Sequence, residues 1–318
     1  MNDRISKNIF LMGALFVLTA PVSFSQRLHL SPHFHAGQTF FYRIEFKSSR
    51  HMKAESRLAS PQLPPTTVVD ASGILQVEIV RASAAGLRVK TYYSERDSSG
   101  SSTSRGVESD VSSSPDKVIE VSIAANGSAS QFKGMDQLSA SQQFAWSDWL
   151  SRFTSSMALP KAGIHVGQKW DLSEPEAASS PIGGLVWVKK YQYVRDEPCP
   201  IRTQAEVSNS LKASAGTENC AVILVNARLR QKSSRNNATP NDYKLQNLKT
   251  RGTASGQNET ILYISRIDGV LVRASENAEQ SMDATIALAN DSNQVHYILD
   301  AKGHSEIVLI SDSSPDAR

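Results

Sequence analysis

Cysteine is scarce in this sequence, and neither sign of charge dominates it. The 318 residues include two cysteines, 34 lysines and arginines, and 31 aspartates and glutamates. So few cysteines exclude a zinc framework built from cysteine clusters. The charges nearly balance and no run of Lys and Arg stands out, which argues against a nucleic-acid groove or a polybasic stretch that binds membrane surfaces. We therefore expect no nucleic-acid partner.

The motifs of several enzyme classes are also missing. The sequence has no Gly-x-Ser-x-Gly nucleophile elbow, no His-Glu-x-x-His, no glycine-rich phosphate loop and no calcium loop of alternating acids. Three histidines near the start, His29, His33 and His35, have no Cys or Asp among them, whereas a zinc site needs three or four fixed ligands. We predict no catalytic residue, no metal site and no cofactor. A hydrolase with an unrecognised site is the remote alternative.

The longest apolar run of the sequence lies at the start of the chain. Arg4 and Lys7 precede the segment NIFLMGALFVLTA, and Pro21, Ser23 and Ser25 follow it. This order of basic, apolar and small residues is typical of a secretory signal peptide, with cleavage after Ser25. The run is shorter than the ~20 residues of a membrane span, and no Cys follows it to carry a lipid anchor. We predict a periplasmic or secreted protein that does not span the membrane after cleavage.

The two cysteines, Cys199 and Cys220, form an even pair. In an oxidising compartment such a pair predicts a disulfide. Closing a loop of this size removes roughly 3 kcal/mol of chain entropy from the unfolded state. Two free thiols are the alternative.

The sequence is rich in the alternation of apolar and polar residues that is typical of half-buried β-strands. In FFYRIEFK, the residues Phe40, Tyr42, Ile44 and Phe46 share one face, and similar alternation occurs in ILQVEIV, GLRVKTYY, VIEVSI, CAVILVNARL, ATIALA, VHYILD and EIVLI. The dipeptides Asn126-Gly127 and Asp268-Gly269 predict hairpin turns, and Lys302-Gly303 predicts another. The polar stretches 98–114, rich in serine, and 231–257 predict long loops.

Two short segments, FHAGQTF at Phe34–Phe40 and IHVGQKW at Ile164–Trp170, share one pattern 130 residues apart. Aligning VIEVSIAANGSAS with TILYISRIDGVLV gives a similar offset, which indicates an internal duplication. In each copy the glycine and the aromatic residue are typical of a turn that enters a strand. We interpret both as structural corners, although packing does not explain His35 and His165.

A segment with helical periodicity separates the two copies. From Ser139 to Leu159, apolar side chains recur at spacings of three and four, at Trp146, Trp149, Leu150, Phe153 and Met157. Ser139 and Gln142 fit a capping box, and Pro160 and Gly163 end the helix.

The predicted fold is mainly β. Two related antiparallel β units, arranged as a sandwich or an open half-barrel, have one aromatic-rich amphipathic helix between or across them. The predicted organisation is a signal peptide at 1–25, a first β unit at 26–137, a linking helix at 138–160 and a second β unit at 161–318.

The segment from Leu159 to Leu229 resembles exported bacterial β-rich proteins of the domain-of-unknown-function type. Leu159-Pro160 and Val166-Gly167-Gln168-Lys169-Trp170 match their Leu-Pro … Val-Gly-x-x-Trp element, and Tyr191 and Tyr193 match their Tyr-x-Tyr strand. The resemblance implies a β-rich exported protein and brings no catalytic residues with it. A fainter similarity is to periplasmic lipoprotein carriers, whose open half-barrel wraps a curved sheet over helices.

Two classes of non-enzymatic function follow. In the first, an exported binding or structural protein of the cell envelope holds an apolar ligand, such as an acyl chain, between sheet and helix. Its predicted contacts are Trp146, Trp149 and Phe153, although such a stripe is more often plain core. In the second, a protein-interaction or assembly module uses exposed strand edges or the Ser-rich segment 98–114. The expected partners are accordingly a lipid or an envelope protein.

Overall fold

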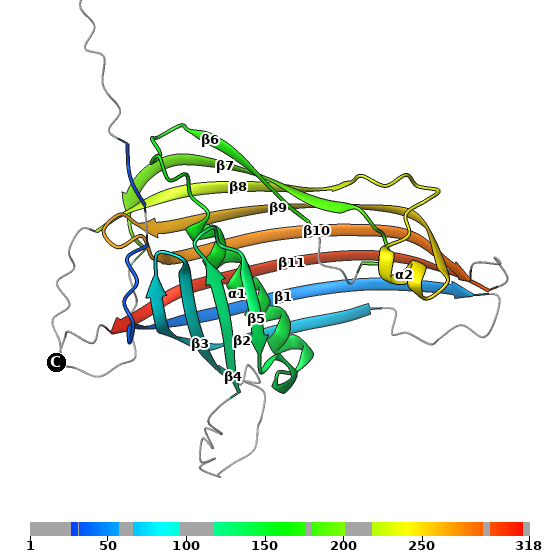
Figure 1. The fold of residues 1–318 in the computed structure, drawn as a ribbon, viewed down its shortest axis with the longest axis horizontal. Helices are drawn as coiled ribbons and strands as arrows, with labels where there is room; N and C mark the ends of the chain where they lie inside the picture. Colours follow the sequence, from blue (N-terminus) through cyan, green and yellow to red (C-terminus); the bar gives the residue numbers. More distant parts are fainter. Residues whose placement is uncertain are drawn as a thin grey trace, which may run out of the picture.

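The described residues form one antiparallel sheet of eleven strands (Figure 1). The computed structural model describes residues 27–30, 32–56, 66–95, 117–175, 180–200, 218–288 and 293–313. The strands are β1 (Thr39–Ser56), β2 (Thr66–Ser83), β3 (Gly86–Glu95), β4 (Val118–Ala124), β5 (Ala129–Lys133), β6 (Lys169–Pro175), β7 (Leu185–Pro198), β8 (Asn219–Gln231), β9 (Leu248–Ser265), β10 (Leu271–Leu288) and β11 (Gln294–Ser313). The helical elements are η1 (Met135–Gln137), α1 (Ala140–Met157) and α2 (Asn241–Leu245). The predicted signal peptide and the Ser-rich segment 98–114 lie outside the described residues.

Two meanders make up this sheet, and they join at its centre. The strand order is β5-β4-β3-β2-β1-β11-β10-β9-β8-β7-β6, and β1 pairs with β11 from Thr39↔Ser313 to Ser56↔Val295. The prediction of two β units is therefore wrong in one respect, because a single continuous sheet includes both halves. Pairing β1 with β11 satisfies two edges that would otherwise carry unpaired N–H and C=O groups. The predicted domain boundaries stay a prediction.

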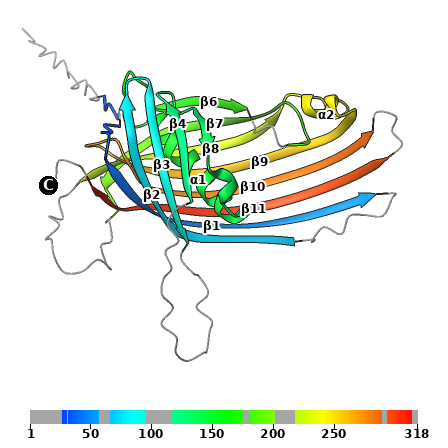
Figure 2. The same ribbon diagram turned by 60° about the horizontal axis from the view of Figure 1, so that its bottom comes forward.

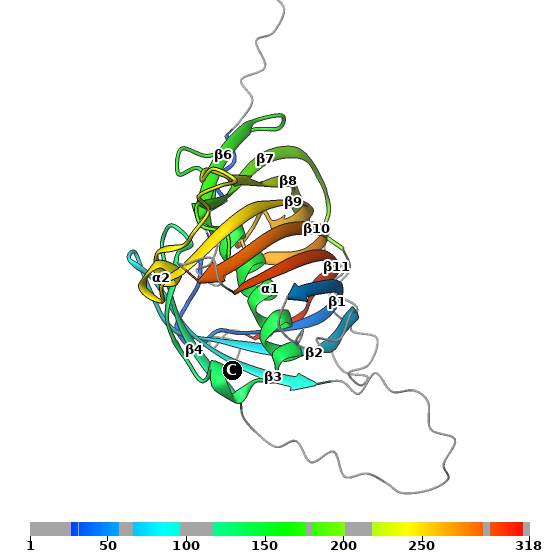
Figure 3. The same cartoon turned by 90° about the vertical axis from the view of Figure 1, so that its right-hand side faces the viewer.

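The sheet curves around α1 (Figures 2 and 3), so of the two arrangements predicted, the sandwich is wrong. The helix lies on the concave face. The long ends of β1, β10 and β11 extend beyond it, and α2 lies near the far end of β9 (Figure 1). We call the concave surface the inner face of the sheet and the opposite surface the outer face.

Helix α1 begins where the sequence predicts. Ser139 is the N-cap: its side chain accepts a hydrogen bond from the Gln142 backbone N–H, and the Gln142 side-chain oxygen accepts one from the Ser139 backbone N–H. This reciprocal pair confirms the predicted capping box and satisfies two N–H groups that have no partner within the helix. The last helical residue is Met157, and Pro160 follows three positions later.

The main hydrophobic core fills the space between α1 and the inner face. The largest fully buried side chains come from the helix and from both halves of the sheet: Trp146, Trp149, Tyr42, Tyr191, Phe40, Phe153, Ile44 and Leu75. Burial of each such side chain stabilises the folded state by on the order of 2–3 kcal/mol. Of the four inward positions predicted from the alternation of β1, Phe40, Tyr42 and Ile44 are buried, and Phe46 is partly buried against the same core.

One predicted long loop and one predicted turn are wrong, because strand residues occupy part of the first and all of the second. The stretch 231–257 is not one loop: it contains α2, and β9 starts at Leu248. Lys302-Gly303 lies within β11, where Gly303 pairs with Ser48 and Ala278. Glycine is normally unfavourable inside a strand, but close packing requires it in β9. A Cβ on Gly256 would lie 2.9 Å from the Trp187 ring, and one on Gly252 would lie 2.2 Å from the Asp283 carbonyl oxygen.

The first His-x-Gly-Gln segment forms a tight turn ahead of β1. Gly37 has a φ of 85°, and the Gln38 N–H donates to the His35 carbonyl over 3.2 Å. The Gln38 side-chain oxygen accepts from the His35 N–H, at 3.3 Å. The Gly37 N–H donates to the carbonyl of Ile79 on β2, whose own N–H donates to Gln38. A positive φ favours glycine at this position.

The second segment repeats these bonds ahead of β6. Gly167 also has a φ of 85°, the Gln168 N–H donates to the His165 carbonyl at 2.9 Å, and the Gln168 side-chain oxygen accepts from the His165 N–H at 3.2 Å. Tyr193 on β7 forms the same bonds as Ile79 in the first turn: its carbonyl accepts from the Gly167 N–H, and its own N–H donates to the Gln168 carbonyl. The two segments are thus equivalent corners, and each Gln holds its turn closed. The histidine rings make no equivalent contact with the described residues: the His165 ring lies 3.1 Å from the Val166 carbonyl oxygen, and no such contact involves the His35 ring.

The predicted disulfide is present. Cys199 and Cys220 are bonded, with their Cα atoms 4.8 Å apart. Cys220 is fully buried in β8, and the Cys199 N–H donates to the Glu218 carbonyl at 2.8 Å. The bond therefore fastens the chain after β7 to the start of β8.

Replacing both cysteines with alanine is expected to lower the free energy of unfolding by about 3 kcal/mol, because the unfolded chain regains the entropy of the open loop. Urea denaturation measures the change. Wild-type protein unfolded in the presence of a reductant is the matched control and should reach the same reduced stability. An unchanged denaturation midpoint in both samples would show that the bond does not constrain the unfolded chain.

Candidate functional site

The three predicted ligand contacts, Trp146, Trp149 and Phe153, lie in the core beneath α1. Each is at most 1% exposed. The Trp149 and Phe153 rings stack with centroids 5.0 Å apart, and the Trp146 indole N–H donates to Thr91 Oγ1 at 2.7 Å. None of the three lines a pocket described below. The geometry gives them a packing role, and ligand contact by these side chains stays a prediction.

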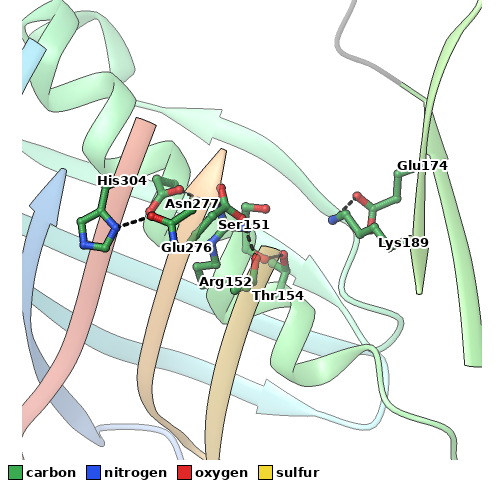
Figure 4. Close-up of polar contacts among 10 residues, drawn as sticks. Ser151, Arg152, Thr154, Glu174, Lys189, Glu276, Asn277 and His304 are labelled. Carbon is green, nitrogen blue, oxygen red and sulfur yellow. Dashed lines mark hydrogen bonds and ion pairs between the residues drawn. The ribbon is translucent and has the colours of Figure 1, made fainter. Parts of the chain in front are cut away.

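A buried group of charges ties α1 to the inner face of the sheet (Figure 4). Arg152 on α1 forms ion pairs with Asp148, one helical turn earlier at 2.9 Å, and with Glu276 on β10. Thr260 on β9 donates its hydroxyl to Glu276 at 2.6 Å. Nearby on β7, Lys189 pairs with Glu174 of the edge strand β6 at 2.6 Å. We call Asp148, Arg152 and Glu276 the helix-anchoring triad.

Burial and mutual attraction set the charges of the helix-anchoring triad. Burial lowers the pKa of the Arg152 guanidinium, but the carboxylates of Asp148 and Glu276 outweigh it and raise the pKa overall. Burial raises the pKa of the Glu276 carboxyl, and the positive charge of Arg152 opposes part of that shift. Burial also raises the pKa of the neighbouring Tyr191 to about 12, which keeps its hydroxyl neutral. Because Arg152 stays positively charged, it binds the two carboxylates as an ion-pair partner and does not donate or accept a proton in a reaction.

Sequence reasoning missed this triad. Asp148 and Arg152 have the i, i+4 spacing that places two side chains on one helix face. Glu276 stands at an inward position of β10, between Ala274 and Ala278. The sequence did show a charged residue at an inward position of β10, which indicates a buried charge. It did not identify the partner of that charge, because the partner depends on where α1 lies over the sheet.

A pocket of about 620 Å³ opens beside the C-terminal end of α1. We call it the seam pocket, because both edges of the curved sheet contribute to it, through Leu172 of β6 and through the turn between β4 and β5. It is lined by His29, Leu30, Pro32, Phe34, Ser83, Ala84, Gly86, Leu87, Ala125, Asn126, Met157, Ala158, Leu159, Pro160, Lys161 and Leu172. Eleven of these sixteen residues are apolar, so the pocket offers mainly hydrophobic surface.

The seam pocket adjoins the aromatic core but is separate from it. The Phe34 ring lies between the two, with its centroid 5.6 Å from that of Phe153 and 5.7 Å from that of Phe40. The segment before β1 is fixed across this end of the sheet, because Leu28 exchanges two backbone hydrogen bonds with Ile164, at 2.7 and 2.8 Å. A ligand in the seam pocket would therefore contact Phe34 rather than the predicted Phe153.

Positive groups gather around the seam pocket. Among the described residues that line the pocket, Lys161 carries the one full charge, and its side chain is exposed. The lining residue His29 is also exposed. Arg27 donates to the carbonyl of the neighbouring Ala162 at 3.4 Å. No aspartate or glutamate is among the described lining residues. The surface of the pocket thus favours a negatively charged group.

The three histidines near the start of the chain occupy different positions. His29 lines the seam pocket, the backbone N–H of His33 donates to the Asp268 carbonyl at 2.9 Å, and His35 lies exposed in its turn. Among the described residues, no three His, Cys, Asp or Glu side chains are arranged to hold a metal ion. None of the described helices has the length and apolarity needed to cross a bilayer.

Comparison with known proteins gives no family. No family model matches the chain, and no curated protein matches it. The solved structures with some likeness include OprG, an outer membrane protein of Pseudomonas aeruginosa (TM-score 0.17, 8% identity, 88% of this chain and 98% of that chain). Ail, the attachment invasion locus protein of Yersinia pestis, has a TM-score of 0.10 at 6% identity, over 85% and 99% of the two chains. CymD, a monoaromatic hydrocarbon channel, has a TM-score of 0.14 at 8% identity, over 87% and 89%. TM-scores of this size do not indicate a shared fold, so these likenesses carry no functional implication.

Proposed function

We propose that this protein is an exported binding protein of the cell envelope that holds a single-chain amphiphile in the seam pocket. The apolar chain lies among Phe34, Leu87, Met157, Leu159 and Leu172, and an anionic head group lies near Lys161. The observation that carries the proposal is a mainly apolar pocket of about 620 Å³ beside positive groups, with no acidic residue in its described lining.

The size and lining of the pocket support this ligand class. Small-molecule sites typically measure about 300–1,000 Å³ and combine apolar walls with a few polar groups that orient the ligand. Each methylene removed from water contributes about 0.8 kcal/mol, so an alkyl chain gains more from these walls than a compact polar molecule does. A carboxylate or phosphate head group pairs with Lys161 at the surface, where it stays partly hydrated.

The envelope location rests on the sequence. The predicted signal peptide and the resemblance of Leu159–Leu229 to exported bacterial β-rich proteins both support it. Single-chain anionic amphiphiles are released wherever membrane lipids are cleaved, so an exported protein would meet them there.

Replacing Leu159 with tryptophan is expected to weaken the binding of a fluorescent fatty acid, dansyl-undecanoic acid, by about tenfold or more, which corresponds to 1.4 kcal/mol. The larger ring occupies volume that the chain needs. Fluorescence titration measures the affinity. The matched control is Leu245→Trp on α2, where Leu245 is 87% exposed, and it should bind like the wild type.

The role of the head group is tested on Lys161. Lys161→Gln should weaken binding of the fatty acid severalfold and leave binding of the corresponding uncharged alcohol unchanged, whereas Lys244→Gln on α2 should change neither. If the wild type does not bind the probe, or if Leu159→Trp and Leu245→Trp bind it equally, the proposed function is wrong.

A further inference from the structure

A second hollow, of about 580 Å³, lies on the outer face of the sheet across β7, β8, β9 and β10. Side chains alternate between faces along a strand. Lys189 and Tyr191 of β7 are buried on the inner face, so Lys190 between them points outward. The same alternation places Arg228 and Arg230 of β8 outward, beside the buried Ala227 and Leu229. We call this region the outer-face hollow.

Three cations line the outer-face hollow without a partner. The side chains of Lys190, Arg228 and Arg230 have no ion pair or hydrogen bond with any described residue. In the strand register, Arg228 lies between Val188 and Gln257, and Arg230 is opposite Val186. By contrast, Arg273, another arginine of the outer face, has an acidic partner, Glu306, at 2.6 Å. Uncompensated arginines grouped in one hollow are a favourable site for anions.

The acidic residues of the hollow cancel little of this charge. Glu279 is paired with Lys302 at 3.0 Å and also accepts a hydrogen bond from Gln257 at 3.3 Å. Glu259 lies between Asn226 and Asn277 in the register. Three free cations therefore face one unpaired carboxylate, and the amides of Asn226, Gln257 and Asn277 add donors and acceptors that suit oxygen-rich groups.

We propose that the outer-face hollow binds an anionic polysaccharide, a linear sugar chain that carries sulfate or phosphate groups. Arg228 and Arg230 are two residues apart on one strand face, which spaces them by about 7 Å, so they suit a polymer that presents successive anionic groups. No aromatic side chain is among the described lining residues. Single-stranded nucleic acids bind largely by stacking bases on aromatic rings, so the lining favours a sugar chain over a nucleic acid.

The test measures binding of dextran sulfate to the full chain at several salt concentrations. The double variant R228Q/R230Q is expected to bind about tenfold more weakly, and its salt dependence should be shallower by about two units of slope, one for each lost contact. The matched control is R43Q/R81Q, which removes the same charge from two outer-face positions of β1 and β2. It should retain both the affinity and the slope.

Uncharged dextran should not bind to the wild type. The proposal is overturned if dextran sulfate fails to bind, if both double variants lose equal affinity, or if inorganic polyphosphate or single-stranded oligonucleotide binds more tightly than dextran sulfate. Leu159→Trp should leave dextran sulfate binding unchanged, so this site and the seam pocket succeed or fail independently.

Discussion

Replacing Arg152 with methionine is expected to lower the free energy of unfolding by about 3–5 kcal/mol. The arginine is 6% exposed and stands between two carboxylates, Asp148 and Glu276. Removing it leaves two buried negative charges that repel each other. Methionine has a similar length and low polarity, so the loss reports the missing charge rather than a cavity. Chemical denaturation at neutral pH measures the change.

The matched control for this substitution is Arg88→Met. Arg88 pairs with Glu120 at 2.7 Å, but its side chain is half exposed. Pairs of that kind contribute about 0–1 kcal/mol, because water already solvates both charges. Similar losses for the two variants would mean that the helix-anchoring triad has no special role in holding α1 on the sheet.

Replacing Phe153 with alanine is expected to cost about 3–5 kcal/mol of stability, because a large buried ring is lost and a cavity is left behind. Phe153 is 0% exposed and its ring stacks on Trp149. If its main role were to contact a ligand, the ligand-free protein would lose little stability. The measurement therefore separates a packing role from the ligand contact predicted from the sequence.

Phe144→Ala is the control on the same helix. Phe144 is 42% exposed, stacks on Phe46 with ring centroids 6.3 Å apart, and has the Arg50 guanidinium 5.8 Å from its ring centroid. Its removal leaves no closed cavity, so we expect a loss of about 1 kcal/mol or less. Equal losses for the two phenylalanines would contradict the placement of Phe153 in the core.

Local features of the fold were predictable because each depends on neighbouring residues. Alternation identified the inward residues of β1, the Ser139 capping box marked the start of α1, and the cysteine pair predicted the disulfide. The repeated His-x-Gly-Gln segments marked equivalent corners, because each turn is closed by its own Gln. These interactions span a few positions of the chain or one loop.

The long-range arrangement was not predictable in the same way. Alternation does not specify which strand edges pair, so the joining of β1 to β11 was missed. The half of β9 that includes Gly252 and Gly256 has polar residues and glycines instead of an apolar face, because Trp187 and Asp283 approach its backbone closely. Such a strand resembles a loop until its neighbours are known.

The candidate sites show the same limit. The seam pocket combines residues from the start of the chain, two hairpins, the end of α1 and the edge strand β6. The triad joins α1 to a glutamate more than a hundred residues away in sequence. No pattern within one segment identifies either group, whereas the aromatic stripe of α1 was conspicuous in the sequence and is buried in the core.

Photo-crosslinking can show whether an acyl chain occupies the seam pocket. A fatty acid with a diazirine near the end of its chain is bound to the full-length protein, irradiated, and located by peptide mass spectrometry. We expect labels on residues of the seam pocket, such as Met157, Leu159 and Leu87, and loss of these labels in Leu159→Trp. Labels confined to other parts of the chain, or equal labelling of the wild type and Leu159→Trp, would contradict it.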